Sequence, residues 1–420
     1  MRFAAGRRAV IVAVVVTVVA LPLVLRNLAS AQLAPPPPTP VDGSPSTFPT
    51  ALTTPANERR PPSLTAPTAL LADLDTGQVL FAKAPTTRRP IASVTKIMTA
   101  LLVLERTRMT DVVLVDPAAV FADDDYGANS TLGLRAGERL SVEDLLYGLL
   151  LGSANDAAEA LAIHVGGSKE AFVELMNRRA RRLDMNDTVF FSPDGLDDRG
   201  RSTVRDLLTL TRAARALPAF DAITATRFHR IPAPEGLDRR IQNRNVLLWL
   251  YPGATGIKTG STARAGACLV ATAGRDGRSL AAIVLGEPDG AFDDAAALLN
   301  YGFDGFGSRT LVAEGEDLGI VAIRGGQVPV QTAAELTRLV PSSDAIVQRR
   351  IVVDPRAAFP PAPGDRVGTL RVLVDGRPVG AVGMVVRLVP DPEADGGPWW
   401  ASSVGAVARA VAGAATSLAD

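Results

Sequence analysis

Cysteine and histidine are almost absent from the sequence. Cys268 is the only cysteine, so no disulfide can form within the chain. The two histidines, His164 and His229, are far apart and show no metal-ligand spacing, which argues against a zinc site and against a Ser-His-Asp triad. Basic and acidic residues balance at 44 each, without the basic excess of a nucleic-acid-binding protein. We therefore expect no metal, no cofactor and no nucleic-acid partner.

Lysine is also scarce. The only lysines are Lys83, Lys96, Lys169 and Lys258, and every other basic residue is arginine. A buried lysine can lose its proton, whereas an arginine keeps its charge. Each lysine is therefore a candidate for chemistry, although Lys83 and Lys169 are interpreted as ordinary solvated charges.

The N-terminus has the features of an export signal. Three arginines (Arg2, Arg7 and Arg8) precede an uncharged, mostly apolar run over residues 9–25, and small residues follow at 29–31. Residues 1–31 are predicted to be a signal peptide or, if retained, a signal anchor, since the run is just long enough to span a bilayer. The arginines stay inside, which places the remainder in the cell envelope.

A linker and a mixed helix–strand region follow. Residues 32–62 are rich in Pro and Thr and predict an extended linker. The stretch "ALLADLDTGQVLFAK" predicts strand, turn and strand, and "GIKTG", "ACLVATA" and "SLAAIVLG" predict strands further on. Between them, helices are expected from Ser93 to about Glu105 and from Ser141, which has Asp144 three residues on, as in a capping box. Helical patterning continues to about residue 215, so the flanking strands are expected to share one sheet.

The sequence changes character near residue 310. Short β-rich runs with glycine turns predict a small all-β domain over residues 307–392, and "VDGRPVG" is typical of a hairpin. Residues 63–306 would form the first folded domain. Residues 393–420 begin with an acidic, Gly-rich stretch, then Trp399 and Trp400, and end in an Ala-rich segment. This tail is either an interfacial membrane helix or a frayed end.

Ser93 and Lys96 are three residues apart at the expected start of a helix, which places them on one face. Free backbone N–H groups and the positive end of the helix dipole favour a developing anion there. A lysine can accept the serine proton only when neutral, and burial or a nearby cation can produce that state. Alone, however, the Ser-x-x-Lys pattern is weak, because chance spacing explains it equally well.

Two further short motifs are ambiguous when each is taken alone. Ser153-Ala154-Asn155 lies between two apolar helical runs, where it either directs polar side chains into a cleft or forms a helix N-cap. Lys258-Thr259-Gly260 opens a strand and offers a cation, a hydroxyl and a position without a side chain. The position without a side chain would let a peptide approach the strand edge, although a Gly-rich turn with a solvated lysine also explains the motif.

The combination of the motifs is more specific than any one of them. They occur in order, and two of the four lysines fall within them. Together they resemble the three motifs of the serine penicillin-recognising enzymes. The surrounding segments "GSANDAAEALAIHVGGSKEAFVELMNRRARRLDM" and "FFSPDGLDD" resemble the low-molecular-weight D-alanyl-D-alanine carboxypeptidases more closely.

This resemblance implies an α/β (α+β) fold of the β-lactamase/DD-peptidase type, with an antiparallel sheet, a helical cluster and a C-terminal β domain. It also implies removal of the terminal D-alanine from peptidoglycan stem peptides through an acyl-enzyme, in the service of cell-wall synthesis and cell shape. β-Lactam antibiotics would acylate the same serine as covalent inhibitors. The membrane would be a partner through the N-terminal segment and, in one interpretation, through the tail.

Residue roles follow from the same resemblance. Ser93 would be the nucleophile and Lys96 the base, and Ser153 would relay a proton to the leaving D-alanine while Lys258 keeps Lys96 neutral. The remaining residues would bind substrate: Asn155 the amide and Thr259 the terminal carboxylate, with Gly260 beside them. The backbone N–H groups of Ser93 and Ser261 would form the oxyanion hole.

The sequence departs from the family at two places. Many relatives carry an aromatic residue or histidine at the position of Ser261. Many also have an arginine shortly before the "DDAAALL" segment that helps to hold the substrate carboxylate, where this chain has Gly290, Ala291 and Phe292.

Three other functions remain open at this level. A class A-like β-lactamase would need a glutamate before the third motif, and no convincing Glu-x-x-x-Asn follows "FFSPDGLDDRG". Transpeptidation would use the same residues as hydrolysis. A cell-wall-binding or scaffold protein of the same fold would have lost its turnover, which the intact Ser93, Lys96 and Lys258 argue against.

Overall fold

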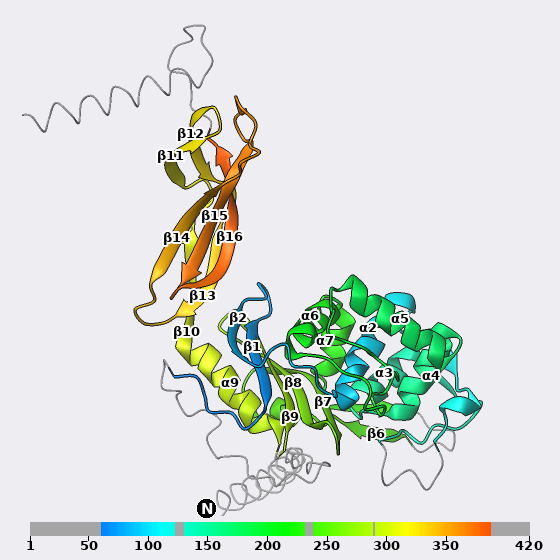
Figure 1. The fold of residues 1–420 in the computed structure, drawn as a ribbon. Coiled ribbons are helices and arrows are strands. Elements are labelled where there is room, and N and C mark those ends of the chain that lie inside the picture. The colour runs from blue at the N-terminus through cyan, green and yellow to red at the C-terminus, as the bar shows by residue number, and fades with distance from the viewer. Residues whose placement is uncertain (1–59, 122–129, 232–237, 289, 388–420) are drawn as a thin grey trace, which may run out of the picture. The chain divides into compact units, whose positions relative to one another are not determined.

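The computed structural model describes residues 60–121, 130–231, 238–288 and 290–387 (Figure 1). The predicted signal segment, most of the linker and the tail lie outside these residues. Within the described ranges, no helix is both long and apolar enough to cross a bilayer.

The elements up to the last helix are β1 (Thr68–Asp73), β2 (Val79–Lys83), the 3₁₀ turn η1 (Ala92–Thr95), α2 (Lys96–Arg106), β3 (Val112–Leu114), the 3₁₀ turn η2 (Pro117–Ala119), β4 (Arg139–Ser141), α3 (Val142–Leu150), α4 (Asn155–Gly166), α5 (Lys169–Arg182), α6 (Val204–Arg215), α7 (Pro218–Thr224), β5 (Phe228–Ile231), β6 (Arg239–Gln242), α8 (Leu247–Leu250), β7 (Ala254–Thr262), β8 (Gly266–Arg275), β9 (Arg278–Glu287) and α9 (Ala291–Gly305). The strands that follow are β10 (Phe306–Val312), β11 (Asp317–Ile323), β12 (Gly326–Thr332), β13 (Leu336–Pro341), β14 (Val347–Val353), β15 (Arg366–Val374) and β16 (Arg377–Val386).

The strands at both ends of the first region form one antiparallel sheet, as predicted. Its order is β2-β1-β9-β8-β7, so β1 pairs with β9 although more than 200 residues separate them in sequence. Short turns join β1 to β2, β7 to β8 and β8 to β9. Asp276 and Gly277, with φ of 51° and 72°, form the two-residue turn between β8 and β9. The strand β7 is left at one edge of the sheet.

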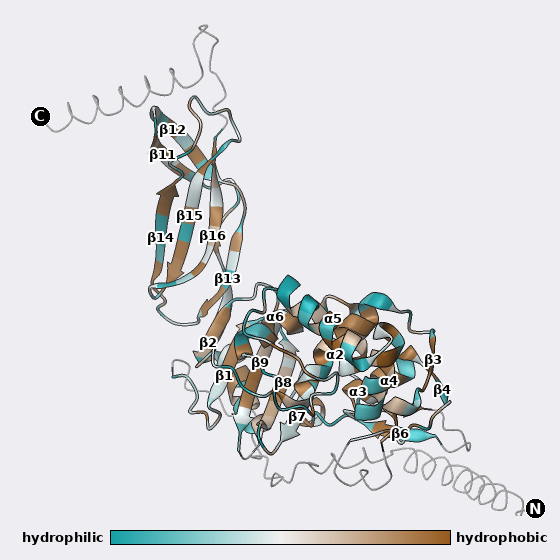
Figure 2. Ribbon diagram, turned by 45° about the vertical axis from the view of Figure 1, so that its right-hand side comes forward, coloured by the Kyte–Doolittle hydropathy of each residue, from teal (hydrophilic) through white to brown (hydrophobic). Residues whose placement is uncertain are grey.

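The sheet is covered on both faces, because neighbouring residues along a strand point in opposite directions. On β8 and β9, Val270 and Ile283 belong to the core shared with α2–α7, whereas Leu269 and Val284 belong to the core shared with α9. Figure 1 shows α9 on one side of the sheet and the helical cluster on the other, and Figure 2 shows the apolar colour along β1 and β9. The predicted helices from Ser141 to residue 215 form most of that cluster.

Two small two-stranded sheets were not predicted. β3 pairs with β4 and β5 pairs with β6, both antiparallel. These strands are three or four residues long, which is too short for an alternating apolar pattern to stand out.

The C-terminal region is all β, in agreement with the predicted fold class. Its main sheet has the order β11-β12-β16-β15-β14, and β10 and β13 form a separate pair. The predicted hairpin joins β15 to β16 through Asp375 and Gly376, which have φ of 50° and 76°. The pair β10–β13 was not predicted from the sequence.

The helical cluster should carry much of the stability of the first region. Leu145 of α3 is completely buried, whereas Leu114 of β3 is 60% exposed. We expect Leu145→Ala to lower the free energy of unfolding by about 2–5 kcal/mol, because it leaves a cavity. Leu114→Ala, the matched control, should change it by less than about 0.5 kcal/mol in urea denaturation. Equal effects of the two substitutions would contradict this description of the core.

Candidate active site

A short 3₁₀ turn brings Ser93 and Lys96 together. The expected helix does not begin at Ser93; η1 covers Ala92–Thr95, and α2 begins at Lys96. Ala92 has a left-handed φ of 46°, which sets the direction of the turn. With three residues per 3₁₀ turn, side chains at i and i+3 lie directly above one another. Lys96 Nζ lies 2.9 Å from Ser93 Oγ.

The amine of Lys96 has two further partners and no contact with solvent. It lies 2.7 Å from Asn155 Oδ1 and 2.7 Å from the backbone oxygen of Asp194, and Lys96 is 0% exposed. The pKa of Lys96 is lowered from 10.5 to about 8, mainly by burial; the charge of Asp194 acts against this and the Arg244 guanidinium adds to it.

The three oxygen atoms around Lys96 Nζ are compatible with both the charged and the neutral amine. A charged amine donates to all three oxygens. A neutral amine donates to Asn155 Oδ1 and the Asp194 carbonyl, and its lone pair then faces the Ser93 hydroxyl. In the neutral state the geometry therefore lets Lys96 accept the proton of Ser93.

The loop Ser153–Asn155 connects α3 to α4, as expected for a loop between helices. Ser153 has a left-handed φ of 60°, and Ala154 is the N-cap of α4 without a side-chain cap bond. The alternative that Ser153 or Asn155 acts as a helix N-cap is therefore wrong. Asn155 instead turns its carbonyl oxygen to Lys96, while Ser153 is 3% exposed and makes no side-chain hydrogen bond within the described ranges.

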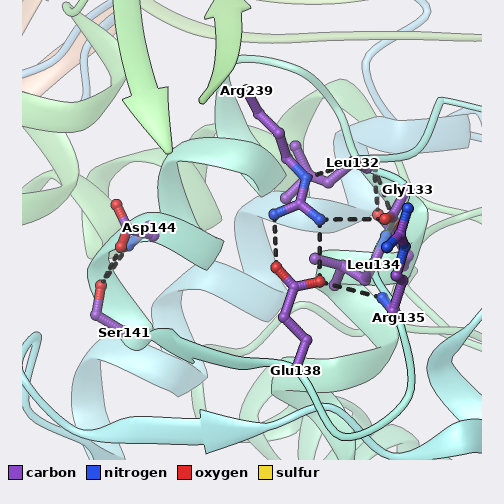
Figure 3. A network of polar contacts seen from close by, with 9 residues as sticks. Leu132, Gly133, Leu134, Arg135, Glu138, Ser141, Asp144 and Arg239 are labelled. Atoms are coloured by element: carbon purple, nitrogen blue, oxygen red, sulfur yellow. Dashed lines mark hydrogen bonds and ion pairs between the residues drawn. The ribbon is translucent and has the colours of Figure 1, made fainter. Parts of the chain in front are cut away.

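A network beneath this loop fixes its position. Asp156, next to Asn155, accepts hydrogen bonds from the backbone N–H groups of Leu132 and Leu134. From the other side, Arg239 of β6 donates to the carbonyls of Leu132 and Gly133 and forms a two-pronged ion pair with Glu138. Figure 3 shows the Arg239 side chain reaching both the carbonyls and the carboxylate. The segment 130–138 is thereby held from two directions.

Side-chain contacts also hold the start of α3 in place. Ser141 is its N-cap, and Ser141 Oγ accepts the Asp144 N–H at 3.0 Å, as the capping pattern predicts (Figure 3). The His229 ring stacks on Tyr147 with centroids 3.6 Å apart and contacts Asp144 at 3.1 Å. His229 is thus a structural residue of the β5–α3 contact.

Gly260 makes room for another part of the same chain, not only for a substrate as the sequence suggests. A Cβ at this position would lie 2.9 Å from the Ser93 nitrogen and 3.0 Å from that of Val94. The absent side chain therefore makes room for η1 of the chain itself, which sets Ser93 directly against β7. Thr259 and Ser261 flank this contact, and Ser261 is exposed.

Lys258 is buried beside Lys96. Its side chain is 1% exposed, and Nζ donates to the Thr259 carbonyl at 3.0 Å. Burial, the charge of Lys96 and the Arg244 guanidinium all lower the pKa of Lys258, well below its ordinary value. A charge on either buried amine disfavours a charge on the other, and the expectation that Lys258 keeps Lys96 neutral stays a prediction.

Arg244 is a second cation near both amines. It keeps its charge where a buried lysine does not, and it lowers the pKa of both lysines. It precedes Lys258 by 14 residues, and no motif in the sequence marked it. Asp194 was also missed as a Lys96 partner, because it acts through a backbone oxygen that any residue could supply.

Glu159 is the third residue that the sequence did not indicate. It lies one turn after Asn155 on α4 and is 6% exposed, and burial raises its pKa from 4.5 to about 7. Lys169 forms an ion pair with it at 3.3 Å, so Lys169 is not the solvated charge that was expected. Lys83 likewise donates to the backbone of Leu64.

Comparisons with known proteins identify the family of the chain. The sequence profile of a family described as D-alanyl-D-alanine carboxypeptidase matches residues 55–289. The carboxypeptidase DacD of Escherichia coli is 34% identical over 299 residues, which cover 68% of this chain and 76% of the relative. DacF of Bacillus subtilis is 29% identical over 322 residues, covering 74% and 82%. The crystal structure of penicillin binding protein 5 from Haemophilus influenzae superimposes with a TM-score of 0.65 at 27% identity, covering 78% of this chain and 98% of that one.

The pH dependence of acylation tests the environment of Lys96. Because only neutral Lys96 accepts a proton, the acylation rate should rise with pH to a plateau above about 8. Arg244→Gln removes a cation that lowers this pKa, so the midpoint should move to higher pH and the relative rate at pH 7 should fall by at least about threefold. Rapid-mixing measurements with a chromogenic β-lactam at each pH give the midpoint.

The matched control is Arg240→Gln, which removes an exposed arginine from β6. It should leave the midpoint where it is. An identical shift in both variants, or none in Arg244→Gln, would contradict the role of Arg244.

Proposed function

Because the chain belongs to the D-alanyl-D-alanine carboxypeptidase family, as a serine hydrolase of the low-molecular-weight penicillin-binding proteins, we propose that Ser93 is its nucleophile. Ser93 Oγ attacks the carbonyl carbon of the penultimate D-alanine. Neutral Lys96 takes the hydroxyl proton as the new C–O bond forms. The observation that carries this assignment is the triple contact of Lys96 with Ser93, Asn155 and Asp194.

Departure of the terminal D-alanine requires a proton on its nitrogen. We propose that the proton held by Lys96 reaches this nitrogen through Ser153, with Lys258 beside it. Lys258 suits a relay because burial favours its neutral form, which can both donate and accept a hydrogen bond. The peptide C–N bond then breaks and leaves an acyl group on Ser93. Water completes the hydrolysis and releases the shortened stem peptide.

Substrate binding is assigned to the groups around this centre. The backbone N–H groups of Ser93 and Ser261 would bind the oxyanion, since the missing side chain of Gly260 brings η1 against β7. Asn155 uses its oxygen for Lys96, which leaves its amide N–H₂ for the substrate amide. Thr259 would donate its hydroxyl to the terminal carboxylate.

We assign the cation that faces this carboxylate to Arg244. The family often places an arginine before "DDAAALL", but this chain has Gly290–Phe292 there. Lys258 is a poor substitute, because its charge is disfavoured by burial. Arg244 acts electrostatically on both lysines, so its charge lies near the end of the cleft where Thr259 stands.

The β-lactamase alternative is not favoured. Penicillin would acylate Ser93 as the peptide does, and the acyl-enzyme would persist. Transfer of the acyl group from Ser93 to an amine, in place of water, would use the same residues.

We also propose how the full chain is organised and where it acts. Residues 1–31 direct export and, if retained, hold the protein at the membrane; residues 32–62 are a linker. Residues 63–306 form the catalytic domain and 307–392 the β domain. Residues 393–420 are the tail, as an interfacial helix in one interpretation. The enzyme would then act on the outer side of the membrane in cell-wall synthesis and cell shape.

The assignment of Ser93 is tested by covalent labelling. We expect fluorescent penicillin to label the wild-type protein and D-alanine to be released from a stem pentapeptide. Ser93→Ala should abolish both, because the acyl-enzyme cannot form, whereas Ser308→Ala, at an exposed serine of β10, should abolish neither. Labelling that survives in Ser93→Ala would place the nucleophile elsewhere, and labelling without release of D-alanine would argue against carboxypeptidase activity.

A further inference from the structure

The direction of the substrate along β7 follows from the proposed function, on which this inference rests. By the proposed function, the terminal carboxylate binds at Thr259, and the carbonyl that Ser93 attacks lies level with Gly260 and Ser261, because Gly260 packs against the Ser93 nitrogen. The stem peptide therefore runs antiparallel to β7, along the free edge of the sheet. An extended chain advances about 3.3 Å per residue, so the residue third from the peptide's C-terminus lies level with Thr262.

An aspartate lies at that level. Thr262 Oγ1 donates to Asp198 Oδ1 at 2.7 Å and in turn accepts the Ala265 N–H at 3.0 Å. The Asp198 carboxylate is therefore held against the last residue of β7. Asp198 is half-buried, so it remains accessible to a ligand.

The segment that carries Asp198 is fixed to the reaction centre. Four residues earlier, the Asp194 carbonyl binds Lys96 Nζ at 2.7 Å. Gly195, with φ of 84°, packs so closely on η1 that a Cβ there would lie 2.0 Å from the Ala92 oxygen. The position of Asp198 relative to Ser93 is thus set by contacts with Lys96, with η1 and with Thr262.

Asp198 is not part of an ion pair within the described ranges. Arg199 binds the adjacent Asp197 at 2.6 Å, and its guanidinium lies 4.6 Å from the centre of the Phe191 ring. Within the described ranges, no lysine or arginine forms an ion pair with Asp198, and Asp198 Oδ2 has no hydrogen-bond partner. A half-buried carboxylate with one hydrogen-bonded oxygen, at the end of the edge strand along which the substrate is proposed to lie, suits a cationic group of the substrate.

We propose that Asp198, positioned by Thr262, binds the protonated side-chain amine of the diamino acid third from the C-terminus of the stem peptide. The preferred substrates are peptides in which this amine is free. Peptides in which it has been acylated, as in a cross-link, lose the charge and the contact. Asp198 is thus a specificity-determining residue, and the enzyme selects stems that have not been cross-linked through that amine.

A matched pair of tripeptides tests this selection. Nα-acetyl-L-Lys-D-Ala-D-Ala carries the free amine, and Nα,Nε-diacetyl-L-Lys-D-Ala-D-Ala does not. We expect wild-type kcat/KM to be about fivefold to tenfold higher for the first peptide. The preference should decrease as salt is raised, because it depends on a partly exposed charge. In Asp198→Asn the ratio should fall below about twofold.

Two further variants separate this role from a structural one. Asp197→Asn, the matched control, should keep the wild-type ratio, because Asp197 is already paired with Arg199. Asp198→Lys should invert the preference, so that a peptide with a succinylated side chain is cleaved faster than the free amine.

The outcomes separate a failure of the Asp198 role from a failure of the proposed function on which it rests. If the wild type cleaves both tripeptides at equal rates, or if Asp198→Asn keeps the preference, the role of Asp198 is wrong while the carboxypeptidase assignment stands. If the wild type releases D-alanine from neither peptide, the proposed function fails and the specificity assignment fails with it.

Discussion

Burial of the Lys96 amine is the constraint on which the rest of the site depends. A charged amine taken out of water is costly unless it is fully compensated, and here the compensation comes from two neutral oxygens and the Ser93 hydroxyl. The pKa falls to about 8, which keeps a useful neutral fraction near physiological pH. In the proposed mechanism, that neutral fraction accepts the proton of Ser93.

Several backbone features exist to produce this environment. Lys96 is enclosed by three segments that are distant in sequence: η1, the α3–α4 loop and residues 192–200. The left-handed φ of Ser153 and the Asp156 network hold the second of these, and the glycines at 195 and 260 let the third segment and β7 approach η1. A larger side chain at either glycine would push a wall of the site away from Ser93. The close backbone contacts that stabilise this part of the fold are therefore the same contacts that position Ser93 and Lys96.

Much of this was predictable from the sequence, and what was missed has physical causes. The rarity of lysine and the order of the three motifs identified Ser93, Lys96, Asn155 and Lys258, which the structure brings together. Strands at both ends of the first region, with helices between them, predicted the shared sheet. The Asp194 contact escaped notice because a backbone carbonyl has no sequence signature, and Arg244 because a single arginine among many has no diagnostic spacing. The 3₁₀ turn at Ser93 and the reason for Gly260 depend on the approach of η1 to β7, which is a tertiary contact.

The central claim is that Lys96 is a neutral base in the folded enzyme, and the scarcity of lysine makes this directly measurable. With ¹³C-labelled lysine only four side-chain signals arise, and Lys96→Arg identifies the one of interest. Carbon NMR across a pH series should show the Lys96 signal titrating with a midpoint near 8. A midpoint at the ordinary value of 10.5 would contradict the account, because the amine would then be charged when the enzyme works.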